Sequence, residues 1–381
     1  MSSKNSKRIK RKVKIGEKKM DKIKFDDLLY MRKGDKNLTM GQSPSKIEKI
    51  ITVEEWEVKA KALREIFFQM LGETPQISCP LSSKIIEENN CGDYIKRKIE
   101  YFVEPDEKIS AYVLIPKNLK TKVPAILCIH PTTPLGKEQT IGNDNTEKGQ
   151  DRAYALHLVK RGYITMSYDL LTAGERCYKG YAPFDTAPFY KKYPKWSVRG
   201  KDLWDVSRAI DFLQSMDEVD SERIGSIGHS QGGGITIHSM VLDKRIKVGV
   251  SSCGMWPERL SKNPFNWART GWWVGIPFLR PYCYTGKHFP LDMHEYLGLI
   301  APRAIMNISA LNDCMYTIEE ENITRDAFNN LSENVSKVFS LYKTENNFKN
   351  IHHMNGHSFL LEQREIAYAF LDKKLRGNNI Y

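Results

Sequence analysis

The stretch that most constrains the fold of this chain is RIGSIGHSQGGGITIHSM, from Arg223 to Met240. A short apolar run leads to a serine between two glycines, Gly228 and Gly232, and apolar residues then recur at helical spacing. We therefore expect a buried strand, a sharp turn and a helix. The pattern G-x-S-x-G is typical of a nucleophilic serine, here Ser230, that a strained turn exposes at the edge of a sheet.

A glycine-rich turn before a helix can instead cradle a phosphate group. The sequence has no G-x-x-x-x-G-K-[ST] motif, and the glycines come too late in the chain for the first strand and helix of a dinucleotide-binding fold. A catalytic turn and a purely structural turn are the two remaining interpretations, and the partners of Ser230 distinguish them.

Short apolar runs rich in Ile, Val and Ala alternate with helical patterns along most of the chain. The runs are VPAILCIHP, YITMSYD, RIGSIGH, VGVSSCG, RAIMNISA and KVFSLYKTE, and the expected helices span 151–160, 201–216, 231–242, 319–331 and 359–375. Runs that are apolar throughout are typical of strands covered on both faces. The sequence therefore predicts an α/β fold, with a mostly parallel central sheet between helices, preceded by an antiparallel pair in IEYFVE and SAYVLIP.

This predicted domain occupies residues 99–381 and is flanked or interrupted by three segments. Residues 1–50 form a basic tail with few apolar residues, which we expect to be disordered. Residues 51–98 are expected to form a helical extension, because Thr52 and Glu55 have the spacing of a capping box. Residues 254–299 place aromatic side chains among Pro and Gly and are predicted to form a cap.

The positive charge is concentrated at the start of the chain. Residues 1–24 hold eleven Lys and Arg against Glu17 and Asp21, and so carry nine of the twelve net charges. This tail is expected either to contact nucleic acid or an anionic membrane surface, or to be a solvated extension.

The seven cysteines are scattered, and the chain shows neither a signal peptide nor an apolar run of about eighteen residues. We therefore expect a cytoplasmic protein without disulfides or integral membrane association.

A nucleophilic serine needs a base, and the base needs an acid that fixes its tautomer. In a parallel sheet these groups come from loops at the carboxyl ends of strands. Asp313 directly follows RAIMNISA, and His357 lies before the last predicted helix. The chain order Ser230, Asp313, His357 is the order of nucleophile, acid and base in hydrolases with this serine motif.

Two alternatives compete with this assignment. Asp169 ends the run YITMSYD and is an alternative acid, although it precedes the nucleophile in the chain. His353 and His357 have the spacing of a metal pair on a helix, but Asn355-Gly356 between them disfavours a helix. No metal or other cofactor is therefore expected.

Negative charge that develops on a substrate carbonyl needs preorganised hydrogen-bond donors. One expected donor is the backbone N–H of Gln231. Because Pro131 has no N–H, the second is expected from Thr132 or, as the alternative, Thr133. The side chains predicted to shape the substrate pocket are His130, Thr133, Trp256, Trp272 and Trp273.

Four segments resemble the dienelactone hydrolase-like branch of the α/β-hydrolases, which includes acetyl xylan esterase-like carboxylesterases. They are DRAYALHLVKRGYITMSYDLLTAGER, WDVSRAIDFLQSMDEVDSERIGSIGHSQGG, LIAPRAIMNISALND and NGHSFLLEQREIAYAFLDKKL. The resemblance implies an α/β-hydrolase fold with Ser230 as nucleophile, His357 as base and Asp313 as its orienting acid. Two features depart from the family. Dienelactone hydrolases carry a cysteine nucleophile, and the loop that commonly reads His-Gly-x-x-Gly is here His130-Pro131-Thr132-Thr133-Pro134.

The sequence therefore predicts a serine esterase that cleaves a small-molecule ester through an acyl-enzyme, without cofactor or metal. A prolyl oligopeptidase-like peptidase is the alternative enzyme, although the chain is short for a large gating domain. The third alternative is a non-catalytic hydrolase fold that binds RNA or another anionic partner through its basic tail.

Deletion of residues 1–24 should leave kcat/KM for a small neutral ester close to that of the full chain. The reason is that a disordered charged tail does not shape a pocket at the edge of a sheet. Hydrolysis of one ester by both proteins, with circular dichroism to monitor folding, measures this. A large loss of activity in a folded protein would show that the tail is part of the site.

Overall fold

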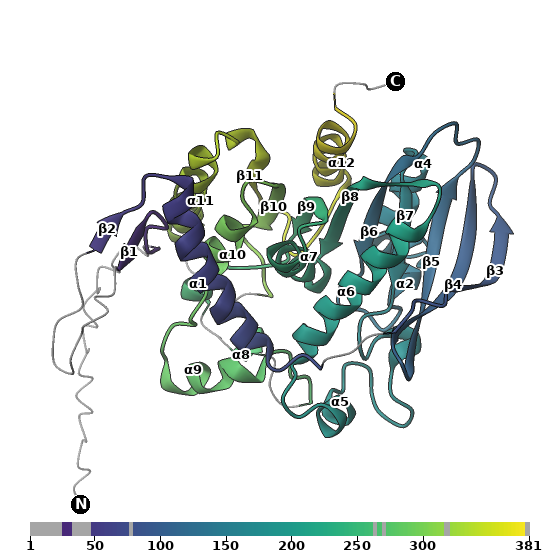
Figure 1. Ribbon diagram of the computed structural model, residues 1–381, viewed down its shortest axis with the longest axis horizontal. Coiled ribbons are helices and arrows are strands. Elements are labelled where there is room, and N and C mark those ends of the chain that lie inside the picture. Colours follow the sequence, from purple (N-terminus) through teal and green to yellow (C-terminus); the bar gives the residue numbers. More distant parts are fainter. Residues whose placement is uncertain are drawn as a thin grey trace, which may run out of the picture.

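The computed structural model describes residues 25–32, 47–75, 79–261, 265–268, 272–315 and 321–377. Its centre is a nine-stranded sheet in the order β11–β10–β9–β8–β6–β7–β5–β4–β3 (Figure 1). β6 to β11 pair in parallel, and β3, β4 and β5 extend one edge in antiparallel pairing. The bounds are β3 Lys84–Asn90, β4 Tyr94–Glu104, β5 Glu107–Pro116, β6 Val123–Ile129, β7 Ile164–Tyr168, β8 Val219–His229, β9 Ile246–Ser252, β10 Ala304–Ala310 and β11 Phe348–His353.

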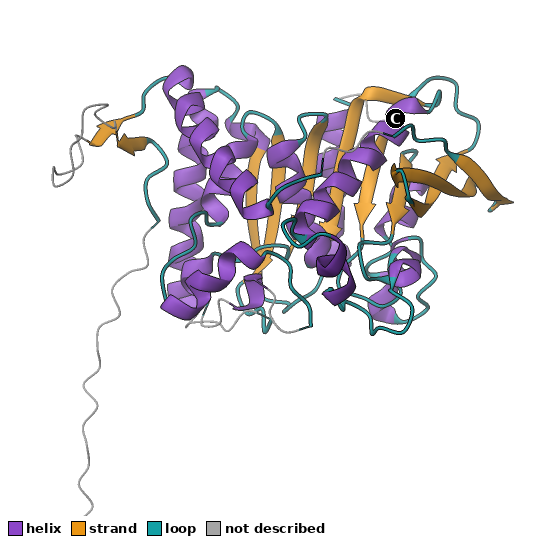
Figure 2. Cartoon of the chain, turned by 60° about the horizontal axis from the view of Figure 1, so that its bottom comes forward, coloured by secondary structure: helices purple, strands orange, loops and turns teal. Residues whose placement is uncertain are grey.

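Helices cover both faces of this sheet (Figure 2). Successive residues of β6 point to opposite faces, so that Ala125 and Leu127 pack with one set of helices while Ile126 and Cys128 pack with the other. The first set is α1 Val53–Leu71, α6 Val198–Ser215, α7 Gln231–Leu242, α10 Met293–Ile300 and α11 Glu321–Leu341, and the second is α4 Tyr154–Lys160 and α12 Leu361–Leu375. This arrangement confirms the predicted α/β fold with a mostly parallel sheet.

Shorter elements lie in the connections, mostly next to the carboxyl ends of the parallel strands. They are α2 Lys137–Thr140, α3 Glu147–Gln150, α5 Ala187–Lys192, α8 Phe265–Ala268, α9 Arg280–Thr285, and the 3-10 turns Gly174–Arg176, Glu258–Leu260, Pro277–Leu279 and Glu345–Asn347. The segment predicted to form a cap therefore contains α8, α9 and two of these turns. It also contains α10, which packs against α7 and α11 as part of the main core.

The predicted last strand KVFSLYKTE is wrong. Its first residues, 337–341, belong to α11, and the edge strand is β11, which the sequence FKNIHH forms. Leu331, Val335, Val338 and Phe339 are all buried at helical spacing along α11. A short apolar run by itself does not distinguish a strand from the end of a buried helix. Here the helical spacing of the buried residues along the whole segment shows that the run belongs to a helix.

The N-terminal boundaries also differ from the prediction. The helical extension expected over 51–98 is helical only in α1, where the predicted Thr52 and Glu55 capping box is present. β3 and the first half of β4 already belong to the sheet, and their exposed edge gave little apolar signal. Within the predicted tail, β1 Tyr30–Arg32 pairs with β2 Ile47–Lys49, and Phe25 and Ile50 are buried. Residues 1–24 and 33–46 lie outside the described residues.

The hydrophobicity of the helices and the state of the cysteines can be compared with the sequence analysis. Within the described ranges, none of the helices has the length and apolar character needed to cross a bilayer. All seven cysteines are free thiols, as their scattered spacing predicts.

A buried ion cluster fixes the start of α6 against the sheet. Lys201 is 1% exposed and lies 2.7 Å from Glu104, 2.8 Å from Glu107 and 2.7 Å from Asp205. Arg176 adds ion pairs to Glu107 and Asp205 at 2.6 and 2.8 Å. Charges this deeply buried persist only when each has partners, so the cluster locks the β4–β5 turn, α6 and the loop after β7 together.

Lys201→Met should lower the free energy of unfolding by about 3–5 kcal/mol, because it leaves buried carboxylates without a partner cation. Urea unfolding measures the change. The control is Lys195→Met, whose ion pair with Glu73 is 74% exposed on both sides and should contribute only about 0–1 kcal/mol. Equal stabilities of the two variants would contradict the structural role of the cluster.

Candidate active site

The turn between β8 and α7 holds Ser230 in a strained backbone conformation, with φ 54° and ψ −123°. Glycines make the turn sterically accessible. A Cβ on Gly228 would lie 2.2 Å from the carbonyl carbon of Gly232, and a Cβ on Gly232 would lie 2.1 Å from the oxygen of Ile129. The sequence G-H-S-Q-G therefore folds here into the strand, turn and helix that its pattern predicts.

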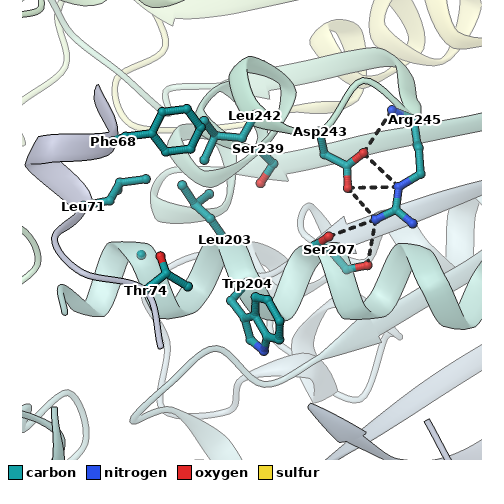
Figure 3. A pocket seen from close by; sticks show the side chains of 11 residues that line it. Phe68, Leu71, Thr74, Leu203, Trp204, Ser207, Ser239, Leu242, Asp243 and Arg245 are labelled. Carbon is teal, nitrogen blue, oxygen red and sulfur yellow. Dashed lines mark hydrogen bonds and ion pairs between the residues drawn. The ribbon is translucent and has the colours of Figure 1, made fainter. Parts of the chain in front are cut away.

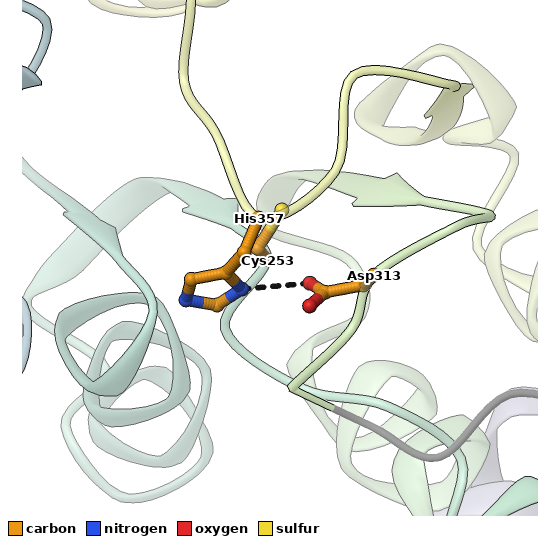
Figure 4. Close-up of side chains that lie close together, drawn as sticks. All are labelled: Cys253, Asp313 and His357. Atoms are coloured by element: carbon orange, nitrogen blue, oxygen red, sulfur yellow. Dashed lines mark hydrogen bonds and ion pairs between the residues drawn. The ribbon is translucent and has the colours of Figure 1, made fainter.

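Ser230, His357 and Asp313 come together at the carboxyl edge of the sheet. His357 Nε2 lies 2.8 Å from Ser230 Oγ, and His357 Nδ1 lies 2.7 Å from Asp313 Oδ2. Figure 4 shows the imidazole ring facing the carboxylate. Asp313 is 1% exposed and also accepts the backbone N–H of Met315 at 3.0 Å. The three residues predicted from chain order thus form one line of hydrogen bonds.

Asn312 links the loop that carries Asp313 to the loop that carries His357. Its amide nitrogen donates to the carbonyl of Met354 at 2.8 Å, and its amide oxygen accepts the backbone N–H of Gly356 at 2.9 Å. Sequence reasoning missed this residue. The available signal was a side-chain amide next to the predicted acid, at the end of a buried strand.

His229, the residue before the nucleophile, packs its ring against that of His357 with 4.9 Å between the centroids. Its Nδ1 lies 3.0 Å from the hydroxyl of Ser252. Burial and the neighbouring His357 lower the pKa of His229 well below its ordinary value, so this imidazole is neutral. A neutral ring supports the position of His357 without adding a competing charge.

Cys253 brings a thiol close to the acid and the base. Its sulfur and the nearest ligand atoms of Asp313 and His357 all lie within 4.8 Å of one another (Figure 4). Burial raises the pKa of the Cys253 thiol to about 12. His353 and His357 do not form a helical metal pair, because His353 is the last residue of β11.

The two loops predicted to donate to the substrate oxyanion lie side by side. The Thr132 hydroxyl donates to the side-chain oxygen of Gln231 at 3.1 Å. Gln231 is the first residue of α7, so its backbone N–H has no acceptor within the helix. Thr133 is buried, and its hydroxyl accepts the N–H of Leu135 at 3.3 Å. The Thr132 side chain therefore contacts Gln231, and the choice between the Thr132 and Thr133 backbone N–H groups stays a prediction.

His130, predicted to shape the pocket, is instead a structural contact. It is fully buried, its Nδ1 lies 2.7 Å from the carbonyl of Pro131, and its Nε2 accepts the N–H of Leu170 at 2.9 Å. Burial lowers the pKa of His130, which is consistent with a neutral ring. The side chain joins the loops after β6 and β7 and does not reach a substrate, so the predicted pocket role is wrong.

The three predicted pocket tryptophans occupy different places. Trp256 is buried, packs against Phe328 and lines a small cavity under the cap. Trp273 stacks on Phe184 with 4.8 Å between the centroids, and the 57% exposed Trp272 stacks on Trp273. Trp272 and Trp273 join the cap to the loop before α5.

Asp169, the alternative candidate for the catalytic acid, forms its contacts with Lys137 and Glu175. Its carboxylate is buried and lies 2.6 Å from Lys137 Nζ, and it accepts the backbone N–H groups of Lys137 and Glu175 at 2.7 and 2.9 Å. Asp169 therefore holds the loops after β6 and β7 together, and chain order selected Asp313 correctly as the carboxylate that contacts His357.

The nine-stranded sheet and the serine turn define this chain as an α/β-hydrolase. A family model described as "Abhydrolase family" matches residues 42–232, just over half of the sequence. The chain belongs to this family. A second model, "Glucuronyl esterase, fungi", matches residues 154–331.

Known relatives extend over most of the chain. The Bacillus subtilis (strain 168) protein YtaP is 25% identical over 321 residues, which cover 82% of this chain and 98% of that protein. The carbohydrate esterase MZ0003, from an unknown prokaryotic organism, is 24% identical over 47% of this chain and 42% of its own. The solved glucuronoyl esterase from Solibacter usitatus superposes with a TM-score of 0.67 at 19% identity, covering 86% and 95% of the two chains. The structural likeness establishes the fold, and the esterases among the sequence matches support an ester hydrolase.

Asp313→Asn should lower kcat by roughly four orders of magnitude at neutral pH while the protein stays folded, because the imidazole loses the acceptor that fixes its tautomer. Asp169→Asn should behave in the opposite way. It breaks a buried ion pair, so we expect a loss of about 3–5 kcal/mol of stability and little change in the kcat of the folded fraction. Melting temperature and kcat of both variants, measured together, test this; a larger kcat loss for Asp169→Asn would reverse the assignment.

Proposed function

We propose that this protein is a serine carboxylic ester hydrolase with Ser230 as nucleophile, His357 as general base and Asp313 as the orienting acid. The observation that carries the proposal is the continuous line of hydrogen bonds between these three side chains. They come from three loops at one edge of the sheet, and the nucleophile stands on a strained turn. The esterases among the matched sequences support the same chemistry.

In the acylation half-reaction, Ser230 Oγ attacks the ester carbonyl carbon while His357 Nε2 takes the hydroxyl proton. Asp313 accepts the Nδ1–H of the imidazolium and so stabilises its charge. The carbonyl oxygen becomes negative and is met by the backbone N–H groups of Gln231 and Thr132. Collapse of this intermediate breaks the ester C–O bond, and the alcohol leaves with the proton from His357.

In the deacylation half-reaction, water takes the place of the alcohol. His357 Nε2 removes a proton from the water as its oxygen bonds to the acyl carbon, and the same N–H groups hold the oxyanion. The bond to Ser230 Oγ then breaks, and the serine recovers its proton from His357. The products are one alcohol and one carboxylic acid, and the residues return to their starting protonation states.

Ser230→Ala should reduce hydrolysis of a short p-nitrophenyl ester by about four to six orders of magnitude, because the triad acts as a unit. The matched control is Ser226→Ala, which removes a buried hydroxyl from the same strand, four residues earlier. A fluorophosphonate probe followed by intact-mass analysis gives an independent measurement. The wild type and Ser226→Ala should gain one adduct, and Ser230→Ala should gain none. Adduct formation or near-normal turnover in Ser230→Ala would place the nucleophile elsewhere.

A further inference from the structure

A small cavity lies next to the nucleophile turn, between α7, the start of α6, α10 and the cap. The backbone N–H of Gly234, in the cavity wall, donates to the carbonyl of Ser230 at 3.1 Å. Gly254, also in the wall, directly follows Cys253, which lies beside Asp313 and His357. The cavity wall is therefore one helical turn from the nucleophile.

Arg199 lines this cavity and forms no ion pair with the described residues. Its Nε and Nη1 atoms are buried without a hydrogen bond, and no carboxylate of the described residues lies within ion-pair distance of the guanidinium. The backbone of Arg199 is fixed to the cap, because its N–H donates to the carbonyl of Gly275 at 3.1 Å. Burial lowers the pKa of Arg199, and the nearby Asp202 opposes this shift.

His238, two turns along α7 from the nucleophile, is the second polar side chain in the wall. It is 6% exposed, and its ring lies 5.0 Å from the Phe67 ring and 4.6 Å from the Tyr296 ring. Neither ring nitrogen has a hydrogen-bond partner in the described part of the chain. Burial and the charge of Arg199 lower the pKa of His238 well below its ordinary value. The neutral ring therefore offers one N–H donor.

The cavity wall also contains two acidic residues, Asp292 and Glu258, and Asp292 Oδ2 is buried without a hydrogen bond, 3.7 Å from Arg259 Nε. Asp292 Oδ1 accepts the backbone N–H groups of Glu258 and Met293, both at 2.7 Å, and the Glu258 carboxylate lies 3.1 Å from His288. Burial raises the pKa of Asp202 to about 7, and the nearby Arg199 opposes this shift. Asp202 therefore offsets part of the charge of Arg199, but the Nε and Nη1 atoms of the guanidinium form no hydrogen bond with the described residues and stay available to a ligand.

A second cavity contains an arginine that is paired, in contrast to Arg199 (Figure 3). Its lining includes Leu203, Ser207, Asp243 and Arg245. It is larger, at about 370 Å³, but its arginine is fully paired. Arg245 donates to both carboxylate oxygens of Asp243 and to the hydroxyl of Ser207. An arginine whose donors are already used does not recruit a ligand, whereas Arg199 has donors to spare.

We propose that the cavity at Arg199 and His238 is a subsite for a carboxylate group of the ester substrate. The inference rests on the proposed function, since it names the substrate class of the same site. A guanidinium presents paired N–H groups that match the two oxygens of a carboxylate. The cavity holds about 50 Å³, whereas a single water needs roughly 10–15 Å³ on the same measure, so it fits three or four non-hydrogen atoms. A terminal carboxymethyl group has this size.

Matched ester pairs that differ only in this group test the proposal. On the acyl side, methyl hydrogen glutarate is compared with methyl 4-carbamoylbutanoate, in which a carboxamide replaces the carboxylate. On the alcohol side, 4-acetoxybutanoate is compared with 4-acetoxybutanamide. We expect the wild type to favour the carboxylate of at least one pair by about ten- to a hundredfold in kcat/KM, because hydrogen bonds between charged groups are strong. The pair that shows the preference identifies which part of the substrate enters the cavity.

Arg199→Met should remove this preference by lowering kcat/KM for the carboxylate esters to the level of the carboxamide esters. Arg199→Lys, which keeps the charge but not the paired donors, should retain part of the preference. Lys195→Met is the control for net charge, because Lys195 is exposed and lies outside the cavity lining. Arg199→Met should also leave the melting temperature nearly unchanged, since the guanidinium forms no ion pair with a described residue and the neighbouring Asp202, with a pKa of about 7, can take up a proton. A clear fall in melting temperature would indicate a structural arginine and would overturn the proposal.

Calorimetric titration of Ser230→Ala with sodium glutarate separates the subsite from catalysis. Binding that is lost in Ser230→Ala/Arg199→Met supports the subsite even if the wild type hydrolyses none of the four esters, in which case only the proposed function fails. The converse result is hydrolysis of the esters without any carboxylate preference and without glutarate binding. That result would leave the esterase intact and show that only water fills the cavity.

Discussion

Backbone strain at Ser230 is the constraint on which the rest of the site depends. A non-glycine residue at φ 54° is unfavourable by itself, and it persists here because β8 and α7 are both buried against neighbours that fix their directions. Gly228 and Gly232 remove the side chains that would hold the strand and helix apart. The strain places the hydroxyl above the edge of the sheet, where His357 reaches it, and points the first N–H groups of α7 toward the same space.

Polar contacts between loops then give this edge its shape. Asn312 joins the loops of the acid and the base, while Asp169 joins the loops after β6 and β7 through Lys137. The cluster around Lys201 fixes the start of α6, and with it the position of Arg199. Because each contact is buried or partly buried, its partners have few alternative positions, and the loops keep the geometry that proton transfer requires.

Much of the triad was predictable from the sequence because it follows from topology. Parallel strands deliver their carboxyl ends to one edge, so Ser230 and Asp313 were expected to meet there. Chain order added His357, although the strand that precedes it was predicted in the wrong place. The pocket was not predictable in this way. His130 stands in the right loop but turns into the core, because its ring satisfies the backbone N–H of Leu170. Whether a loop side chain points into the core or into a pocket depends on contacts far away in the chain.

The sequence by itself determined the α/β-hydrolase class, the serine turn and the order of the catalytic residues, because these depend on local periodicity, glycine sterics and the direction of the strands. Only the tertiary structure decided the roles of the charged residues. Lys137, Lys201, Arg199 and Arg245 carry the same charge in the sequence. Lys137 and Lys201 have buried carboxylate partners, Arg245 has a partly buried one, and Arg199 forms no ion pair with the described residues. The reason is that electrostatic pairing is set by distances of a few ångströms between residues far apart in the chain, and no local pattern encodes those distances.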